Sequence, residues 1–290
     1  MTDIILFRSF GTHNGTFHAD EVTACALLII FDLIDRDKIV RSRNDEELSH
    51  LEYVCDVGGI YNPAIKRFDH HQKEYQGELS SAGMILQYLR DEQIIDEGIF
   101  QYLRLGLVKG IDEIDNGLVD PVEGHATFSS VIANFIPISY NATTEEMFIA
   151  FERALDFVIN YIRHKLEKYA YVQECKGAVK EEMDKQDRCL YFQHSMPWLE
   201  PFFEMGGDDH PAQFVLMPTG QHWKLRAIPP SYKDRMRTRK PLPKKWAGLL
   251  ENDLKKASNI EGAIFCHKGR FISIWETKED ALAALKEALK

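Results

Sequence analysis

Acidic and histidine side chains recur directly after short apolar runs in the first 120 residues of this chain. The densest group is Asp69-His70-His71, which follows Arg67 and Phe68. Histidine and carboxylate ligands without paired cysteines suit manganese, iron or zinc better than a thiolate site would. The candidate residues, in chain order, are His13, His18, Asp20, Asp56, Asp69, His70, His71, Asp112 and Asp115.

The elements that must position these residues alternate between strand and helix. Apolar runs predict strands at residues 3–9, 38–43, 53–57 and 65–68, and helical spacing predicts helices at 18–33, 81–90 and 100–111. Such alternation predicts βαβ units and a parallel sheet. Because parallel strands end in one crevice, the candidate residues should converge there.

The second half of the chain has a different pattern. Residues 143–186 form an uninterrupted apolar stripe behind a capping box at Thr143 and Glu146, which predicts one or two long helices. Beyond residue 189 we expect hairpins at 213–228 and 263–275, a helix at 242–257, and a last helix at 278–289 capped by Thr277.

The predicted fold class is therefore α/β with three parts. A parallel-sheet domain occupies residues 1–142, a long helical connector residues 143–187, and a smaller α+β domain residues 188–290. We expect the first part to hold the chemistry and the last part to hold the substrate.

Composition narrows the class of protein. The chain has 290 residues, 44% of them hydrophobic, and a net charge of -10, which argues against attraction of nucleic acid or anionic lipid over the whole surface. Five scattered cysteines suit a reduced compartment. No apolar stretch reaches about 18 residues and no basic leader opens the sequence, so we predict a soluble, cytoplasmic protein without a membrane partner.

The candidate residues lie within strings that resemble a known family. The strings are THNGTFHADE at 12–21, DVGG at 56–59, RFDHHQ at 67–72, SSAG at 80–83 and DEIDNG at 112–117. They match, in order, the four motifs of the DHH phosphoesterase superfamily, and most closely its melanocyte proliferating gene family. Pro241-Leu242-Pro243 and Trp246-x-Gly248-Leu249 extend the resemblance over nearly the whole chain.

The resemblance implies a two-metal phosphodiesterase that uses manganese, with magnesium, zinc or iron as other possible ions. It implies that His13, His18 and Asp56 hold one ion. It implies that Asp20, Asp56, His70 and Asp112 hold the other, so that Asp56 bridges. His71 would face the substrate phosphate and Asp69 would orient the histidines. A ligand role for Asp115 is left open.

A basic run in the second half is the candidate substrate surface. Residues 233–240 are the densest positive segment of an acidic chain, and Trp223, Tyr232 and Trp246 lie nearby in sequence. A solvated loop and a phosphate- and base-binding surface are both open interpretations. The predicted substrate-binding residues are Trp223, Arg235, Arg237, Arg239, Lys240 and His267.

The sequence thus favours a manganese-dependent phosphodiesterase, specifically a 3′–5′ exonuclease acting on RNA or short oligonucleotides. The alternatives are a phosphatase for a small nucleotide or pyrophosphate, and a non-catalytic metal- or nucleotide-binding regulator. Relatives carry a Gly-Gly-His-like string near the last hairpin where this chain has bulky residues at 271–276. Because of that departure the natural substrate is left open. The oligomeric state is left open as well.

Overall fold

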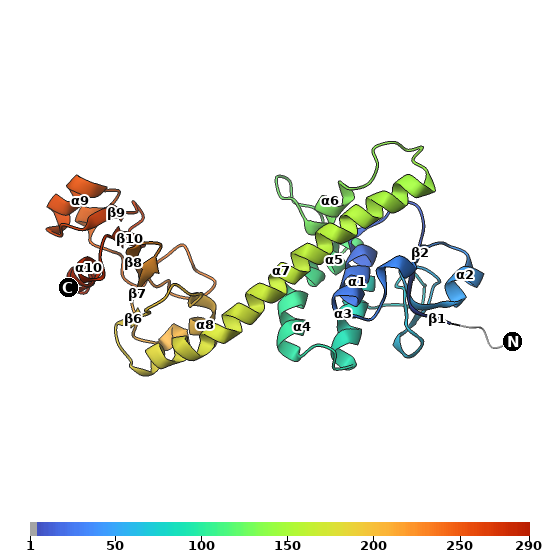
Figure 1. Cartoon of the computed structure of the whole chain (residues 1–290), viewed down its shortest axis with the longest axis horizontal. Coiled ribbons are helices and arrows are strands. Elements are labelled where there is room, and N and C mark those ends of the chain that lie inside the picture. The colour runs from blue at the N-terminus through green and yellow to red at the C-terminus, as the bar shows by residue number, and fades with distance from the viewer. Residues whose placement is uncertain (1–4) are drawn as a thin grey trace. The chain divides into compact units, whose positions relative to one another are not determined.

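The computed structural model describes residues 5–290, so the first part of the predicted strand at residues 3–9 lies outside the described residues. Internal contacts divide the chain into two units, with the boundary in the sequence after Tyr169. Figure 1 labels the helices and strands of both. Each unit has its own five-stranded sheet. The domain boundaries expected after residues 142 and 187 stay predictions.

The first unit is built on a mostly parallel sheet. The strand order is β2-β1-β3-β5-β4, and only the edge strand β4 runs antiparallel to its neighbour. Parallel pairing brings the carboxyl ends of four strands to one edge of the sheet. The strands are β1 (Leu6–Thr12), β2 (Ile39–Arg41), β3 (Leu51–Cys55), β4 (Tyr61–Asn62) and β5 (Arg67–Phe68).

Alternation of side chains along the strands gives this sheet two covered faces. Phe10 and Tyr53 point into the main core, which they share with α1 and α3. Their neighbour Val54 packs instead with Leu48 of α2, in a small cluster of its own. The helical elements of this unit are α1 (Ala19–Ile30), η1 (Arg36–Lys38), α2 (Asp45–Ser49), η2 (Pro63–Ile65), α3 (Ser81–Asp91), α4 (Glu97–Leu103), η3 (Arg104–Val108), α5 (Lys109–Asp115) and α6 (Phe128–Ala133).

The helix predicted at residues 100–111 is longer and less regular than expected. It runs without a break through α4, η3 and α5, and η3 is a π-helical turn. A π turn inserts a residue into the helical register and is frequent at functional sites. It therefore sets which face Asp112 and Asp115 present at the far end of the run.

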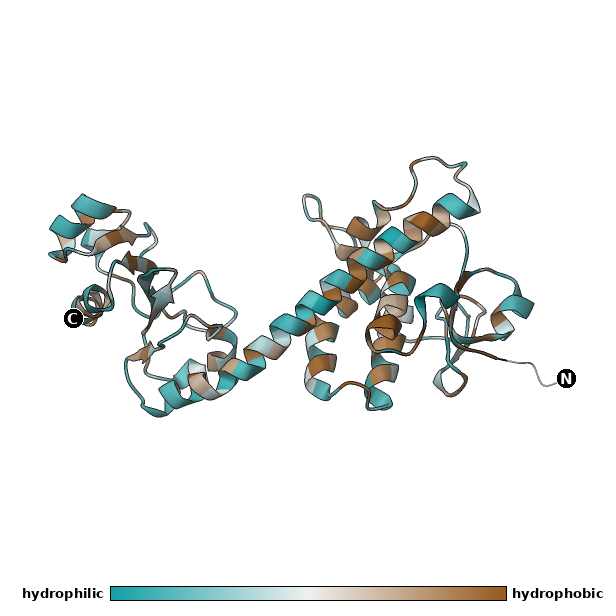
Figure 2. Cartoon of the chain, viewed as in Figure 1, coloured by the Kyte–Doolittle hydropathy of each residue, from teal (hydrophilic) through white to brown (hydrophobic). Residues whose placement is uncertain are grey.

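Helix α7 (Thr144–Asp184) is a single helix of 41 residues. Its N-terminus is closed by the predicted capping box, in which Thr143 and Glu146 exchange hydrogen bonds. Figure 2 shows teal and brown bands alternating along it. Apolar residues from its first half, including Leu155 and Ile162, belong to the core of the first unit. Val179 and Met183 belong to a core of the second unit.

The second unit contains a mixed sheet in the order β6-β7-β8-β10-β9, in which only β6 and β7 are parallel. Both predicted hairpins are present, as β7 with β8 and as β9 with β10. The elements are β6 (Cys189–Tyr191), α8 (Leu199–Glu204), η4 (Gly207–Asp209), β7 (Phe214–Thr219), β8 (His222–Ala227), η5 (Lys244–Trp246), α9 (Glu251–Ser258), β9 (Ala263–Cys266), β10 (Ile272–Trp275) and α10 (Lys278–Ala288).

The helix predicted at residues 242–257 is wrong in its first half. Only the short turn η5 follows Pro243, and α9 begins at Glu251. Gly248 stands at φ +74°, in the left-handed region that ends a helix. Leu250 then forms a bridge with Phe265 of β9. The segment is a loop with one 3₁₀ turn, which packs Trp246 into the core.

Candidate metal centre

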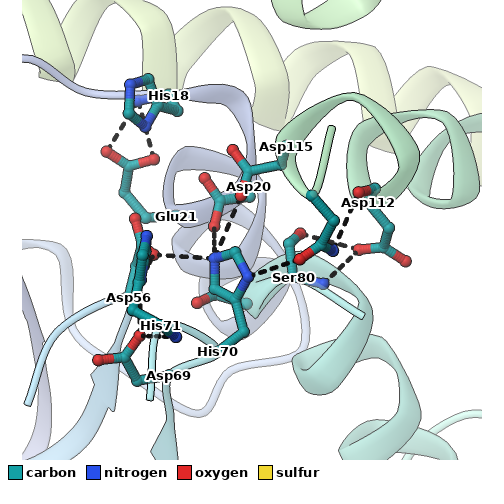
Figure 3. A network of polar contacts seen from close by, with 12 residues as sticks. His18, Asp20, Glu21, Asp56, Asp69, His70, His71, Ser80, Asp112 and Asp115 are labelled. Atoms are coloured by element: carbon teal, nitrogen blue, oxygen red, sulfur yellow. Dashed lines mark hydrogen bonds and ion pairs between the residues drawn. The ribbon is translucent and has the colours of Figure 1, made fainter. Parts of the chain in front are cut away.

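The carboxyl ends of the parallel strands carry the candidate residues. His13 directly follows β1, Asp56 directly follows β3, and Asp69 directly follows β5. His18 is the N-cap of α1, so Asp20 lies in the first turn of that helix. The structure thus brings together side chains that are far apart in sequence (Figure 3).

Asp56 lies between two histidines. Its Oδ2 is 3.1 Å from Nε2 of His13, and its Oδ1 is 3.3 Å from Nε2 of His70. Both oxygens are buried, and among the described residues no contact to them has hydrogen-bond geometry. Asp56 also adopts φ +57°, a strained backbone conformation for a residue other than glycine. This carboxylate is therefore placed to serve two neighbouring cations.

The ring of His70 is oriented by Asn116. The amide nitrogen of Asn116 donates to the carbonyls of Glu78 and Asp112, so its Oδ1 must accept from Nδ1 of His70, 2.9 Å away. Nε2 of His70 is then the nitrogen with the lone pair, and it faces carboxylates. A histidine whose second nitrogen donates outward in this way is typical of a metal ligand.

His13 repeats the arrangement on the other side of Asp56. Its Nδ1 lies 3.0 Å from the carbonyl oxygen of Asn14, which can only accept, so Nδ1 carries the proton. Its Nε2 faces Asp56 and, at 3.4 Å, Oε1 of Glu21. In their neutral form the two histidines therefore present lone pairs at Nε2 beside opposite oxygens of one carboxylate.

Three overlapping groups have donor atoms within 4.8 Å of one another, a spacing that could hold a metal ion. Asp56 belongs to two of the groups, and His18 also belongs to two. Such sharing is what two adjacent ions require. The groups are His13, His18, Glu21 and Asp56; Asp56, His70 and His71; and His18, Asp20 and Asp115.

The protein alone does not balance the negative charge of the carboxylates at this centre. Burial and the nearby Asp56 raise the pKa of Glu21 to about 7, and burial with the same neighbour raises the pKa of Asp20 well above its ordinary value. Burial would also raise the pKa of Asp56, but the rings of His13 and His70 outweigh it and lower that pKa to about 2. Both oxygens of Asp20 are buried without a hydrogen-bond donor in the described chain. Divalent cations fit this donor set.

The basicity of the two histidines reflects the same excess of negative charge. Burial would lower the pKa of His70, but Asp115 and Asp56 outweigh it and raise the pKa to about 10. For His13, burial is outweighed by Asp56 and Glu21, and the pKa is raised. Without a metal, these carboxylates favour a proton on Nε2 of each ring. A metal ion would replace that proton.

Asp112 is placed differently from the other predicted ligands. Its Oδ1 accepts from the amide and hydroxyl of Ser80 and from the amide of Gly83, at the start of α3. Its Oδ2 is paired with Arg104 in the π turn. The structure does not bring Asp112 into any of the three groups and brings Asp115 there instead, 3.1 Å from Nε2 of His70. Asp112 as a ligand stays a prediction.

Asp69 and His71 form a separate pair at the rim. The Oδ1 of Asp69 accepts from both the amide and Nδ1 of His71, and its Oδ2 accepts from the amide of Gly59. The His71 side chain is 63% exposed. Since Nδ1 donates to Asp69, its Nε2 is left for a ligand, as expected of a residue that faces substrate.

A cavity of about 620 Å³ opens over the centre. His13, His18, Asp56 and His71 line it, and so does Arg43, which lies two residues beyond the carboxyl end of β2. Arg43 is exposed and forms no ion pair with any described residue. It is a positively charged side chain beside a negative centre, which favours a phosphate at this position. Sequence reasoning missed both Arg43 and Glu21.

The residues predicted to bind substrate in the second unit are not equally available. The guanidinium of Arg239 donates to the carbonyls of Gly207, His210, Ala212 and Pro229, and Lys240 donates to the carbonyl of Leu289. These two side chains hold the fold together. Trp246, one of the aromatic residues close to the basic run in sequence, is fully buried and cannot stack on a base.

Other members of that predicted surface remain accessible. Arg235 stacks on the ring of Tyr232, with its guanidinium carbon 3.8 Å from the ring centroid. Arg237 is 79% exposed and lies 3.4 Å from Asp234. Trp223 is half-buried and stacks parallel to Tyr191, and His267 lies half-buried against Phe271.

The fold and this centre define an α/β protein with a histidine- and carboxylate-rich site of the kind that binds divalent metal ions. Within residues 5–290, no helix combines the length and apolar character needed to cross a membrane. The MYG1_exonuc family model, described as "Uncharacterised protein family (UPF0160)", matches residues 9–289. The chain therefore belongs to the MYG1 family, and the family predicted from its motifs is confirmed.

Individual relatives match over almost the whole chain. The MYG1 protein of Chlamydia muridarum is 49% identical over 283 residues, which cover 98% of this chain and 97% of that protein. The MYG1 exonuclease of Mus musculus is 31% identical over 323 residues, covering 96% and 84%. The human MYG1 exonuclease is 30% identical over 321 residues, covering 96% and 85%.

Among solved structures, this chain aligns with RecJ from Thermus thermophilus in complexes with Mn²⁺ and Mg²⁺. The alignments cover 97% of this chain and 52% and 49% of RecJ, with 12% and 10% identity. The TM-score is 0.28 in both cases, which is too low to assign the fold by likeness.

Proposed function

We propose that this protein is a metal-dependent phosphodiesterase that holds two divalent ions, manganese in the first instance, on either side of Asp56. The observation that carries the proposal is the pair of oriented histidines, His13 and His70, facing opposite oxygens of one buried carboxylate. Bound metal ions would supply Lewis-acid activation of a water molecule for attack on phosphorus.

The residues of the chain have distinct roles in this proposal. His13, His18 and Glu21 would complete one metal site with Asp56. Asp20, His70 and Asp115 would complete the other. Glu21 and Asp115 enter because their oxygens lie within the donor groups.

His71 and Arg43 would contact the substrate phosphate. Asp69 fixes Nδ1 of His71 as a donor, so that Nε2, when protonated, can donate to a phosphoryl or leaving oxygen. Arg43 would pair with a non-bridging oxygen of the phosphate in the 620 Å³ cavity.

We further propose that the substrate is RNA or a short oligonucleotide, degraded from its 3′ end in the cytoplasm. The names of the mammalian relatives, MYG1 exonuclease, support a nucleic-acid substrate. The exposed Arg235 and Arg237 of the second unit offer contacts to remote phosphates. Five cysteines without a disulfide suit a reducing compartment.

The test is hydrolysis of RNA, DNA and dinucleotides by the full chain loaded with Mn²⁺, with Asp56→Asn as the matched inactive variant. RNA labelled at its 5′ end is expected to shorten stepwise to a ladder of labelled oligonucleotides while unlabelled mononucleotides are released, and a blocked 3′ end is expected to protect it. Equal activity of the wild type and Asp56→Asn would overturn the metal-based proposal. Activity that a blocked 5′ end abolishes would overturn the direction.

A phosphatase for a small nucleotide is the second candidate. The cavity over the centre has room for a mononucleotide without any contribution from the second unit. Release of inorganic phosphate from mononucleotides, with no cleavage of dinucleotides, would favour this candidate over a phosphodiesterase.

A further inference from the structure

A second cavity touches the metal centre from another side. It has a volume of about 430 Å³ and lies among the N-terminus of α1, the C-terminus of α5 and the segment that carries α6. It shares His18 with the first cavity and contains Asp115, so two of the residues that line it belong to one of the donor groups.

The lining of this second cavity does not suit an anion. Among the described residues that form it, there is no lysine or arginine, and the one carboxylate is Asp115. The first cavity, in contrast, contains Arg43. A phosphate would therefore favour the first cavity, and the second should take an uncharged group.

The walls of the second cavity suit a ring system with polar edges. Ile114 and Pro121 provide apolar surface, and Thr127 and Ser129 provide hydroxyl groups. A mostly apolar pocket with a few placed polar groups is the usual form of a site for a small organic ring. Its volume lies within the range of such sites.

His125 adds a directional contact. Its Nδ1 lies 3.2 Å from the carbonyl oxygen of Glu123, so Nδ1 donates and Nε2 is left as an acceptor. An acceptor of this kind can receive a hydrogen bond from the exocyclic amino group of a base, and the ring can also stack on the base.

We propose that this second cavity binds the nucleoside on one side of the scissile phosphate. The proposal rests on the proposed phosphodiesterase function. A phosphate held at the metal centre would direct one ester substituent past His18 and Asp115 into this cavity, while its charged oxygens face Arg43. The cavity would then supply affinity for a base and ribose that the phosphate contacts cannot supply.

The test is a binding comparison that does not depend on turnover. Ser129→Leu/Ala133→Leu places two extra side chains four residues apart on α6, on the side that lines the cavity. Ala126→Leu/Asn134→Leu is the control, since both of its positions are exposed and neither lines the cavity. The ligands, titrated calorimetrically into the Mn²⁺-loaded protein, are adenosine monophosphate and inorganic phosphate.

The wild type and the control are expected to bind adenosine monophosphate more tightly than phosphate by about tenfold or more, and the filled variant should lose that difference. Its affinity for inorganic phosphate and its Mn²⁺ stoichiometry should not change. If the filled variant does not fold, His125→Ala provides the second variant, with a loss of about threefold or more expected for adenosine monophosphate alone.

Unchanged binding of adenosine monophosphate by the filled variant or by His125→Ala would overturn the inference. Equal weakening by the control would overturn it as well. The proposed function fails differently: the wild type would bind neither phosphate nor Mn²⁺ and would not cleave dinucleotides.

Discussion

Asp56 combines three properties that rarely occur in one residue: a left-handed backbone, a buried side chain, and contacts to two histidines through opposite oxygens. Asparagine tolerates the same backbone conformation, so Asp56→Asn removes the charge without adding backbone strain. We expect this variant to bind neither Mn²⁺ ion and to lose activity by roughly 100-fold or more.

His13→Ala should lose only one of the two ions, because His13 faces a single oxygen of Asp56. The comparison is made by calorimetric stoichiometry and by rates at saturating Mn²⁺. Equal residual rates for the two variants would contradict a shared carboxylate.

The raised pKa of Glu21 predicts how the stability of the metal-free protein depends on pH. Its pKa is raised to about 7 by burial and by Asp56, so the native state holds this proton more tightly than the unfolded chain does. The resulting stability is complete below the ordinary pKa of 4.5 and is lost as the pH rises through 7. For this group alone the loss amounts to about 3 kcal/mol.

The measurement is urea unfolding of metal-free protein between pH 5 and pH 8. Glu21→Gln keeps the shape of the side chain and its bond to the His18 amide, and it should lose less stability over this range than the wild type. Parallel curves for the two proteins would contradict the assignment.

The positions of single residues at this centre could be predicted from the sequence where a strand end or the start of the helix after β1 determines them. His13, Asp56 and Asp69 follow apolar strands, and a parallel sheet brings such positions to one edge. The choice between Asp112 and Asp115 depends on the register of a helix that contains a π turn, which apolar spacing does not reveal. Glu21 could have been found from its place three residues after the N-cap His18, a capping-box position.

The start of α3 shows how one element supports another. Asp112 of α5 accepts hydrogen bonds from Ser80 and Gly83, and this approach is possible because Gly83 has no side chain. A Cβ on Gly83 would lie 2.4 Å from an oxygen of Asp112. Gly83→Ala should therefore destabilise the first unit by about 2 kcal/mol.

Gly110→Ala is the control, since a Cβ there meets no described atom within 4 Å and alanine favours a helix. It should leave stability unchanged or raise it by roughly 0.5–1 kcal/mol. Thermal unfolding of both variants gives the comparison. A Gly83→Ala protein as stable as Gly110→Ala would show that Asp112 does not hold the start of α3.

The helix expected at residues 242–257 shows where local sequence misleads. Pro243 suits the first turn of a helix, and the following residues have adequate helical propensity. The buried Trp246 and the bridge from Leu250 to β9 determine the conformation instead, because burial of a large ring and pairing at a sheet edge outweigh helical propensity. Tertiary contacts of this kind are not visible in a sequence.

At the scale of the whole molecule, an acidic chain that acts on RNA, as proposed, would need to attract it locally. Arg235 and Arg237 are the accessible members of the basic run, whereas Arg239 is bonded to backbone carbonyls. Arg235→Ala/Arg237→Ala should weaken RNA binding and lower its salt dependence by about one unit of slope for each phosphate that an arginine no longer neutralises. Stability and cleavage of a small chromogenic diester should not change.

Arg239→Ala is expected to behave in the opposite way, with a loss of stability of about 2–3 kcal/mol in the second unit. Filter binding at several salt concentrations and urea unfolding separate the two effects. An unchanged salt slope in the Arg235→Ala/Arg237→Ala protein would mean that the run is a solvated loop.

Helix α7 has a consequence for the rate at which its amide hydrogens are replaced by deuterium. Its buried residues form two groups, of which the first ends at Ile162 and the second begins at Val172. Every residue from 163 to 171 is only partly buried or exposed. The amide hydrogens near Leu155 and Val179 exchange only when the core around them opens, whereas those at 163–171 exchange through local opening of the helix. One uninterrupted helix should therefore label in its middle first, and its two ends should report separately on the cores to which they belong.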